Sequence, residues 1–243
     1  MVLCVLLMLS LPLAAQAFTG PKAATDANGK PLKIEGSVVI VEPDIELTLV
    51  TAGGLQEPRK EWSDNARRLY PLAARELLHG RGALPKPDYD VPDTLDPASR
   101  LGQVLRLNQA VALSIAQYSQ PGSALATKKD AKSGKPLLEW TLGPGVGELR
   151  EATGADYALF TYVRDSYASG GRSTLRVFAM LAGAALGSYV DIGGGAQVGV
   201  ATLVDLRSGQ VVWFNLMANQ SGDLRDEKGT QATVGQLLLG LPL

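Results

Sequence analysis

Apolar and polar residues alternate in several short stretches of the chain, and this pattern predicts the strands of a β-sheet. A β-branched run covers residues 37–42 and ends at Pro43. Residues 44–50 then alternate with period two, as expected of a half-buried strand or an extended edge. Residues 156–163 have the aromatic and β-branched content of a further strand.

The second half of the chain contains the clearest β-hairpin. Residues 196–206 and 210–219 are rich in valine and aromatic residues, and Ser208 and Gly209 lie between them. Glycine readily adopts the positive φ angle that a tight hairpin turn needs. We therefore expect these two segments to pair as antiparallel strands.

A different spacing, with apolar residues three and four apart, predicts helices over residues 60–79, from Asp96 to about Tyr118, and over residues 230–239. Asp96 before Pro97 is a typical helix start, and Pro71 is expected to bend or split the first helix. A short helix is expected before Gly154, with Leu149 and Ala152 facing inward. The predicted fold is α/β (α+β): a mixed β-sheet with a hairpin in its C-terminal half, flanked by about four helices.

The first 36 residues differ from the rest. Residues 1–17 are apolar and end in Ala15-Gln16-Ala17, which predicts a signal peptide cleaved after Ala17. The alternative is an uncleaved anchor, although the apolar stretch is shorter than the roughly 20 residues of a spanning helix. Residues 18–36 are interpreted as a flexible leader and residues 37–243 as a single domain.

An apolar insertion at residues 174–190 joins two predicted strands, and no charged residue occurs from Val177 to Val190. One interpretation is an element that enters a membrane or forms an oligomer, and the favoured one is a helix of small residues packed on the sheet. The candidate residues for an interaction or membrane contact are Leu175, Val177, Phe178, Met180, Leu181 and Leu186.

Composition restricts the chemistry. The net charge is −1, which argues against a nucleic-acid partner, and the chain has one cysteine and one histidine. Zinc sites of Cys and His, disulfide scaffolds and Cys-dependent triads are therefore excluded. His79 is interpreted as a cap at the end of the first helix. No catalytic, cofactor-binding or metal-binding residue is predicted, and we expect no cofactor and no enzyme activity.

Two acidic groups have competing interpretations. Asp88, Asp90, Asp93 and Asp96 could hold calcium, but the segment lacks the glycine and closing glutamate of an EF-hand loop. We interpret it as a solvated loop ending in a helix cap. Glu42, Asp44 and Glu46 could bind a metal or a basic partner, and the preferred interpretation is a charged strand edge that discourages aggregation.

Two motifs support a resemblance to known proteins. Gly154-Ala155-Asp156-Tyr157 enters a predicted strand, and the hairpin has Asp205 before its Ser208-Gly209 turn. This combination resembles the envelope proteins related to the curli secretion lipoprotein CsgG, whose fold is akin to the amino-terminal domain of TolB. Glu42-Pro43-Asp44-Ile45-Glu46, with residues 51–58 and Trp62, resembles a proteobacterial family of exported proteins of unknown function.

These motifs are structural, so the resemblance carries over no catalytic residue. It implies a non-enzymatic periplasmic domain that binds other envelope proteins or its own copies. The leading hypothesis is therefore a periplasmic accessory protein that acts by protein–protein contacts in envelope assembly or export. The alternatives are a CsgG-like oligomeric secretion component with peripheral or outer-membrane contact through residues 174–190, and a hydrolase that uses carboxylates.

Overall fold

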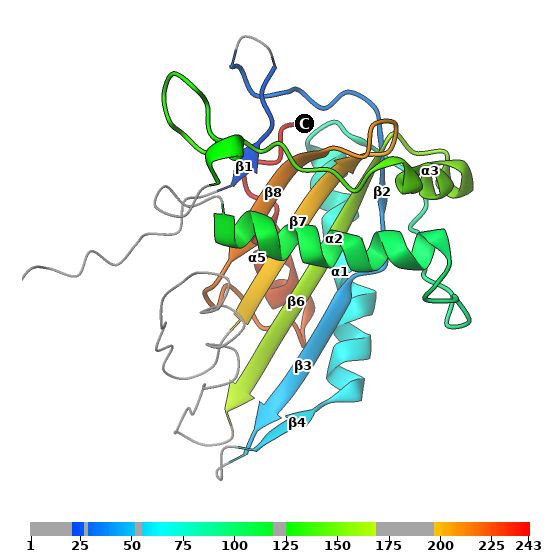
Figure 1. Cartoon of the computed structure of the whole chain (residues 1–243). Coiled ribbons are helices and arrows are strands. Elements are labelled where there is room, and N and C mark those ends of the chain that lie inside the picture. Colours follow the sequence, from blue (N-terminus) through cyan, green and yellow to red (C-terminus); the bar gives the residue numbers. More distant parts are fainter. Residues whose placement is uncertain (1–20, 27–28, 52–54, 119–124, 169–196) are drawn as a thin grey trace, which may run out of the picture.

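The computed structural model describes residues 21–26, 29–51, 55–118, 125–168 and 197–243 (Figure 1). Its strands are β1 Lys22–Ala23, β2 Ser37–Ile40, β3 Asp44–Val50, β4 Gln56–Pro58, β5 Leu84–Pro85, β6 Tyr157–Ala168, β7 Gln197–Asp205 and β8 Val211–Met217. Its α-helices are α1 Lys60–Gly80, α2 Arg100–Tyr118, α3 Gly147–Thr153 and α5 Glu227–Leu237. Single 3-10 turns cover Ala126–Lys128 and Pro144–Val146.

The strands form one mixed, open sheet, which confirms the predicted fold class. Its order is β1-β8-β7-β6-β2-β5, and β3 pairs with the second half of β6 and with β4. β2 and β3 run parallel to β6, whereas β7 is antiparallel to both β6 and β8. The long central strand β6 therefore has two successive partners along one of its edges.

Helices cover both faces of the sheet. α2 crosses one face, and α1 and α5 pack on the other (Figure 1). Each face has its own apolar core: Tyr70, Trp213 and Leu237 belong to the α1/α5 side, and Phe160, Ile115 and Phe214 to the α2 side. Burial of these two cores is the main stabilising contribution to the domain.

A one-residue slip separates β2 from β3 and changes which side chains face α2. Ile40 lies opposite Leu159, whereas Asp44 lies opposite Tyr162, so three residues of one strand oppose two of β6. Such a bulge reverses the alternation of side chains. Val39 and Val41 pack on the α2 side before the bulge, and after it Asp44 and Glu46 replace the apolar residues on that face.

Several predicted elements are confirmed: the strands after residues 37 and 44, the hairpin, and helices close to those expected over residues 60–79 and 230–239. α1 continues through Pro71 without interruption. α2 begins at Arg100, because Pro97 and Ala98 form a turn capped by the Asp96 carboxylate, which accepts a 2.8 Å hydrogen bond from the Ala98 N–H.

Two expectations were wrong in detail. Ala152 is exposed, because α3 is only about two turns long and Leu149 is the one residue that it buries. Part of the segment expected to be a flexible leader belongs to the domain. Lys22 and Ala23 pair with Phe214 and Trp213, and Ile34 is buried in the core. β1 covers only part of the β8 edge, which is too short a pairing for the sequence pattern to reveal.

Candidate functional site

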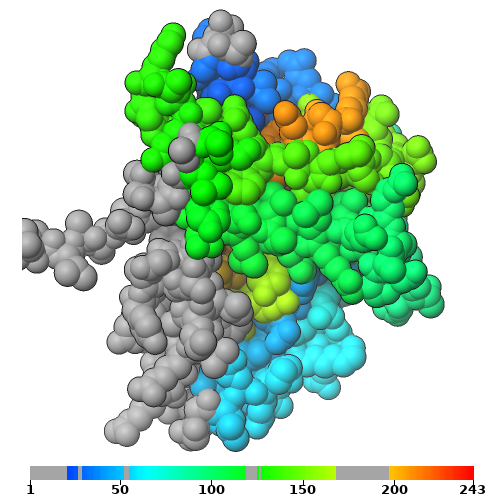
Figure 2. All heavy atoms as spheres, in the orientation of Figure 1, coloured from blue at the N-terminus to red at the C-terminus, as the bar shows by residue number. Residues whose placement is uncertain are grey.

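A hollow of about 380 Å³ opens at the bulge between β2 and β3. α2 forms one wall, the loop around Val91 another, and β6 the floor. The polar side chains of this hollow include Glu42, Asp44, Asp93, Asn108, Gln109, Tyr162 and one cation, Arg67, which is paired with Asp64. In Figure 2, α2 is a continuous ridge across this face, and atoms of β6 and β3 are visible below it. We call this feature the bulge hollow.

Arg164 holds the floor of the bulge hollow in place. Its guanidinium lies 3.9 Å from the ring centre of Tyr162, and its Nη1 lies 2.8 Å from Oδ1 of Asp44. The other oxygen of Asp44 accepts a 3.0 Å hydrogen bond from Gln109 on α2. Both oxygens of Asp44 are thus engaged within the protein. Burial raises the pKa of Tyr162, which keeps its hydroxyl neutral.

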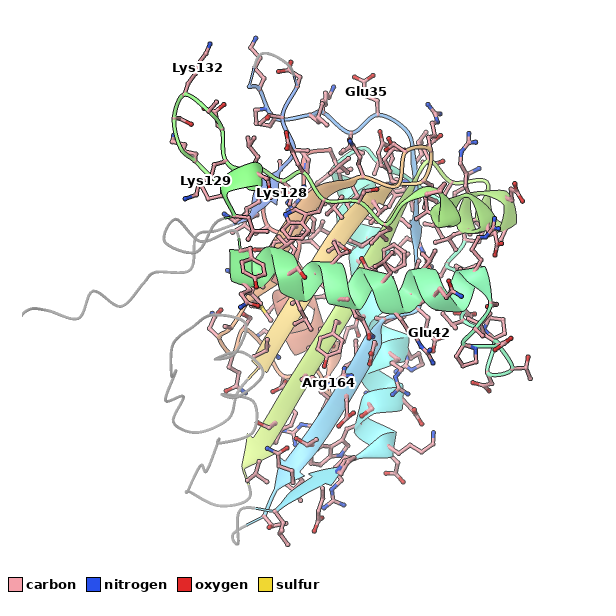
Figure 3. All side chains as sticks on the ribbon, in the orientation of Figure 1. Glu35, Glu42, Lys128, Lys129, Lys132 and Arg164 are labelled. Atoms are coloured by element: carbon pink, nitrogen blue, oxygen red, sulfur yellow. The ribbon has the colours of Figure 1, made fainter. Side chains whose placement is uncertain are left out.

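Other side chains at the bulge hollow have atoms that can form further hydrogen bonds or ion pairs. Glu42 accepts a 2.9 Å hydrogen bond from the Val91 N–H through Oε2 alone, and its side chain is exposed (Figure 3). Asp93 is exposed and forms no ion pair with a described residue. Asn108 is only 8% exposed, and its Oδ1 accepts a hydrogen bond from Thr202. Among the described residues, no acceptor is bonded to the Nδ2 of Asn108.

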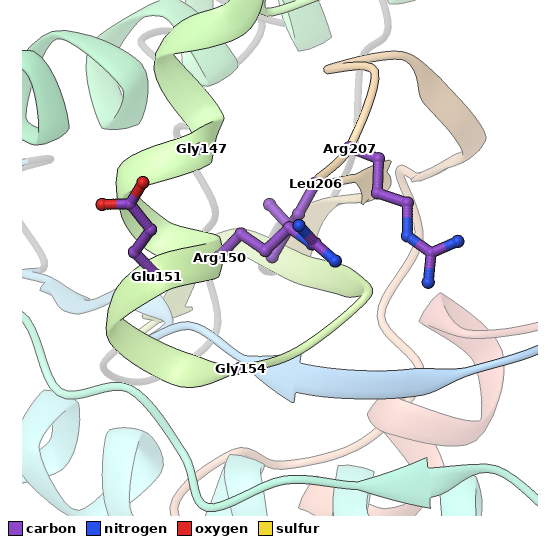
Figure 4. A pocket seen from close by; sticks show the side chains of 6 residues that line it. All are labelled: Gly147, Arg150, Glu151, Gly154, Leu206 and Arg207. Carbon is purple, nitrogen blue, oxygen red and sulfur yellow. The ribbon is translucent and has the colours of Figure 1, made fainter.

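A second hollow, of about 470 Å³, lies beside α3 and the β7–β8 turn (Figure 4). Arg150 and Arg207 are its cationic side chains, and the Glu151 carboxylate points away from them. Arg207 is bound to Asp156 at 2.6 Å. The Ser37 N–H, 3.0 Å from Asp156, is the main cause that lowers the pKa of this carboxyl. Asp156 therefore connects the start of β2 to β6 and to the hairpin turn.

A third group of polar residues is buried on the α1/α5 side. Asp165 is completely buried, and its Oδ2 accepts hydrogen bonds from the Tyr167 hydroxyl at 2.7 Å and from Gln197 at 2.8 Å. Burial raises the pKa of Asp165 to about 6. The Leu224 N–H donates a 3.1 Å hydrogen bond to the Tyr167 hydroxyl. This network fixes the loop before α5 to the end of the sheet.

The guanidinium of Arg225 covers the outer side of this network. Arg225 lies 4.0 Å from the ring centre of Tyr167 and 4.8 Å from that of Trp62. Its guanidinium also binds Asp223 at 2.6 Å, which lowers the pKa of that carboxyl. The aromatic faces are therefore occupied from within the protein, in a stabilising cation–π arrangement.

The outer face of α2 is unusual for a surface helix. From Leu107 to Tyr118 it has no charged residue. Leu107 and Leu113 are 41% and 47% exposed, and Ala110 lies exposed between them. We call these three residues the α2 stripe. A helix that faces water normally carries charged residues on that face, so the α2 stripe is a candidate contact surface.

Only some of the residues singled out from the sequence lie in the part of the chain that the structure describes. All six candidates of the insertion, Leu175 to Leu186, lie outside the described residues, and so does the alternative of membrane contact through residues 174–190. His79 lies in the last turn of α1. Asp88 forms an ion pair with Arg75, and Asp90 is exposed.

The described residues contain neither a candidate metal site nor a candidate membrane-spanning helix. They contain no group of three or more His, Cys, Asp or Glu residues arranged to hold a metal ion. None of the described helices combines the length and the apolar character that crossing a bilayer requires.

Sequence reasoning missed Arg164, Asp165 and Tyr167, because the predicted strand ended at residue 163 whereas β6 continues to Ala168. The alternation of polar and apolar residues stops at Arg164-Asp165-Ser166, three polar residues in a row before Tyr167. The polar residues on both faces hid the strand, since a half-buried strand normally has one apolar face.

Comparison with known proteins gave only distant similarity. No protein-family model and no curated protein matches the chain. Among solved structures, it is similar to the lipoprotein GNA1162 from Neisseria meningitidis, with 17% identity, a TM-score of 0.30, and coverage of 76% of this chain and 81% of that one. It is also similar to the PelC dodecamer from Paraburkholderia phytofirmans, with 11% identity, a TM-score of 0.32, and coverage of 85% and 94%.

A second crystal form of PelC, with one substitution and also a dodecamer, gives 13% identity, a TM-score of 0.33, and coverage of 89% of this chain and 91% of that one. These neighbours are a lipoprotein and PelC, and TM-scores near 0.3 are too low to carry a conclusion about function. The resemblance to the CsgG and TolB group stays a prediction from the sequence motifs.

Proposed function

We propose that the protein is a non-enzymatic accessory protein of the bacterial cell envelope that acts by binding other envelope proteins. The observation that carries this proposal is the α2 stripe. Exposed apolar side chains that gather on a helix are costly in water and are favourable when a partner covers them. Interfaces of this kind place apolar residues at the centre and polar residues at the rim.

The surroundings of the α2 stripe support a docking surface. α2 is the outermost described helix of its face (Figure 2), and residues 91–99 before it are a mostly exposed loop. Arg100 and Arg106 are the only charged residues of the helix, and both lie before the stripe. The charges are thus at one end of the apolar surface, as expected for a rim.

The use of the buried and half-buried carboxylates favours a structural role over hydrolysis. The carboxylate oxygens of Asp44 bind Arg164 and Gln109. Those of Asp156 bind Ser37 and Arg207. Asp165 has the pKa that a general acid needs, but it is completely buried and bonded to Tyr167 and Gln197. A carboxyl that no substrate can reach stabilises the fold and does not take part in hydrolysis.

The envelope part of the proposal rests on the signal peptide predicted for residues 1–17. Fractionation of the native host, with the intact mass of the recovered protein, tests it directly. A periplasmic or envelope-associated species beginning at Phe18 is expected. A cytoplasmic species with the original N-terminus would contradict this part.

Crosslinking in the native host tests the contact surface. A photo-crosslinking amino acid placed at Leu113 is expected to give discrete adducts with other envelope proteins. The matched control is Leu72 on α1, which is 51% exposed on the opposite side of the sheet and is expected to give none. The proposal is wrong if Leu113 yields no adduct, or if both positions yield the same adducts.

A further inference from the structure

Oppositely charged surfaces lie beyond the two ends of α2. Residues 128–135 form a protruding loop with four lysines, Lys128, Lys129, Lys132 and Lys135, and one aspartate. We call it the basic loop. The bulge hollow and the adjoining loop carry the exposed carboxylates of Glu42, Asp90 and Asp93. In Figure 3 the labels of Lys132 and Glu42 lie on opposite sides of α2.

We propose that the basic loop of one copy of this chain binds in the bulge hollow of a second copy, in a head-to-tail contact. This inference rests on the proposed function, since it names one protein that the chain binds. The two surfaces belong to different parts of the same molecule, so each copy can bind one neighbour on each side. Contacts of this type close into a ring or continue as a filament, depending on the rotation between copies.

The basic loop is already shaped for such a contact. Lys129 and Pro136 form an antiparallel bridge, and the N–H groups of Asp130 and Gly134 bond within the loop at 2.9 Å each. Oδ1 of Asp130 accepts a further 2.6 Å bond from the Ser133 N–H. A loop held in this way loses little conformational entropy on binding.

The lysines differ in how free they are. Lys128 donates to the Glu139 carbonyl and lies over the Trp140 ring at 5.4 Å, so it anchors the loop to the body. Lys132 and Lys135 are exposed and form no ion pair with another described residue. In Figure 3, Lys132 points away from the protein at the tip of the loop. These two side chains are therefore available to a neighbour.

The bulge hollow needs two kinds of partner group. Glu42 and Asp93 favour a cation, and the Nδ2 of Asn108, which is accessible to water, has no acceptor among the described residues. An acceptor from a partner can replace the water at this donor. A metal ion would satisfy the carboxylates but would repel the amide hydrogens. A peptide loop supplies both groups, lysine ammonium for the carboxylates and backbone carbonyl oxygen for Asn108.

Sedimentation velocity of the purified protein over a range of concentrations tests the contact. The acidic surface is reversed by Asp90→Lys with Asp93→Lys, and the basic loop by Lys132→Glu with Lys135→Glu. Each double variant alone is expected to weaken self-association by at least about tenfold, because like charges then face each other. None of the four residues forms an ion pair with another described residue, so both variants should fold, which circular dichroism verifies.

Mixing gives the decisive result. An equimolar mixture of the two double variants again pairs opposite charges, and it is expected to restore assemblies of the wild-type size. The matched control reverses Glu61 and Glu76 on α1, which are exposed and unpaired among the described residues, and it should assemble as wild type. Salt near 1 M is expected to weaken the wild-type contact, since screening acts over about 3 Å at that concentration.

A wild-type protein that stays monomeric at all concentrations would overturn the inference. The same holds for assemblies that neither double variant weakens, or for a mixture that stays monomeric. These outcomes are separate from the crosslinking at Leu113, because a monomer that forms adducts with another envelope protein leaves the proposed function intact. A chain that self-associates but forms no such adducts would contradict the proposed function and leave the head-to-tail contact intact.

Discussion

The Tyr167 hydroxyl donates a 2.7 Å hydrogen bond to Oδ2 of Asp165, two residues earlier on β6. Side chains at this spacing lie on the same face of a strand, so the pair is formed within one strand. Gln197 on β7 donates to the same oxygen, and Oδ1 has no partner among the described residues. Burial outweighs the two hydrogen bonds, and the pKa of Asp165 rises to about 6.

This pKa predicts how stability depends on pH. The folded-state value of about 6 lies above the unfolded value of 3.8, so between them the folded protein holds a proton that the unfolded chain has released. The contribution of Asp165 to the free energy of unfolding is therefore largest below about pH 4 and falls as pH rises towards 6. The difference between the two pKa values corresponds to about 3 kcal/mol of the free energy of unfolding.

Asp165→Asn isolates this contribution. The amide oxygen still accepts from Tyr167 and Gln197, and the variant has no proton to lose. Urea unfolding of both proteins is compared at about pH 4 and about pH 7. The variant is expected to gain about 2 kcal/mol relative to wild type between these values. The contribution of Asp156, whose pKa is lowered, has the opposite slope and cancels in the difference. A difference independent of pH would refute the assignment.

Tyr167→Phe is expected to loosen the loop that precedes α5. The substitution removes the donor to Asp165 and the acceptor for the Leu224 N–H, at a cost of about 1–3 kcal/mol. Hydrogen exchange at the Leu224 amide should become faster. Tyr70→Phe is the matched control, because Tyr70 is also a buried tyrosine and its hydroxyl accepts a hydrogen bond from Thr161. Equal acceleration at Leu224 in both variants would contradict the local role of Tyr167.

Local sequence patterns found the elements with a strong pattern of their own, and they failed where tertiary pairing decides. α1 has an amphipathic pattern, and the hairpin has two apolar strands around a Ser-Gly turn, buried on both faces. β1 is two residues long and exists because β8 offers an edge, which no local pattern of Lys22 and Ala23 reveals. The extension of β6 to Ala168 was lost because Arg164 and Asp165 are polar on opposite faces.

The candidate surfaces were only partly accessible from the sequence. Glu42, Asp44 and Glu46 were recognised as a charged edge, and the structure pairs two of them with Arg164. The bulge that turns Asp44 towards α2 depends on the register of β2 and β3 against β6. Leu113 lies in a helix that was predicted from its apolar spacing, and only packing shows which leucines of that helix remain exposed.

Gly209 in the hairpin turn is expected to tolerate no side chain. It has φ of +75°, and an added Cβ would lie 2.3 Å from the Gly143 carbonyl oxygen. Gly134 has a similar φ of +66° with nothing within 4 Å of its added Cβ. Gly134→Ala is therefore expected to cost about 1 kcal/mol of backbone strain, and Gly209→Ala about 3 kcal/mol, since overpacking adds to it. Thermal unfolding compares them. Equal losses would mean that the turn moves away from Gly143 freely.

The α2 stripe separates binding from stability within one helix. Leu113 is 47% exposed, so Leu113→Ser is expected to change the free energy of unfolding by less than about 0.5 kcal/mol. Ile115, two residues later, is completely buried, and Ile115→Ala should cost about 2–5 kcal/mol.

Binding is expected to depend on Leu113 and not on Ile115, the opposite of stability. With the photo-crosslinking amino acid at Leu107, Leu113→Ser should reduce the adducts severalfold, because it removes apolar surface from the contact. Ile115→Val keeps the outer face and should leave the adducts unchanged. Adducts that survive Leu113→Ser would show that the partner contacts a different part of the helix.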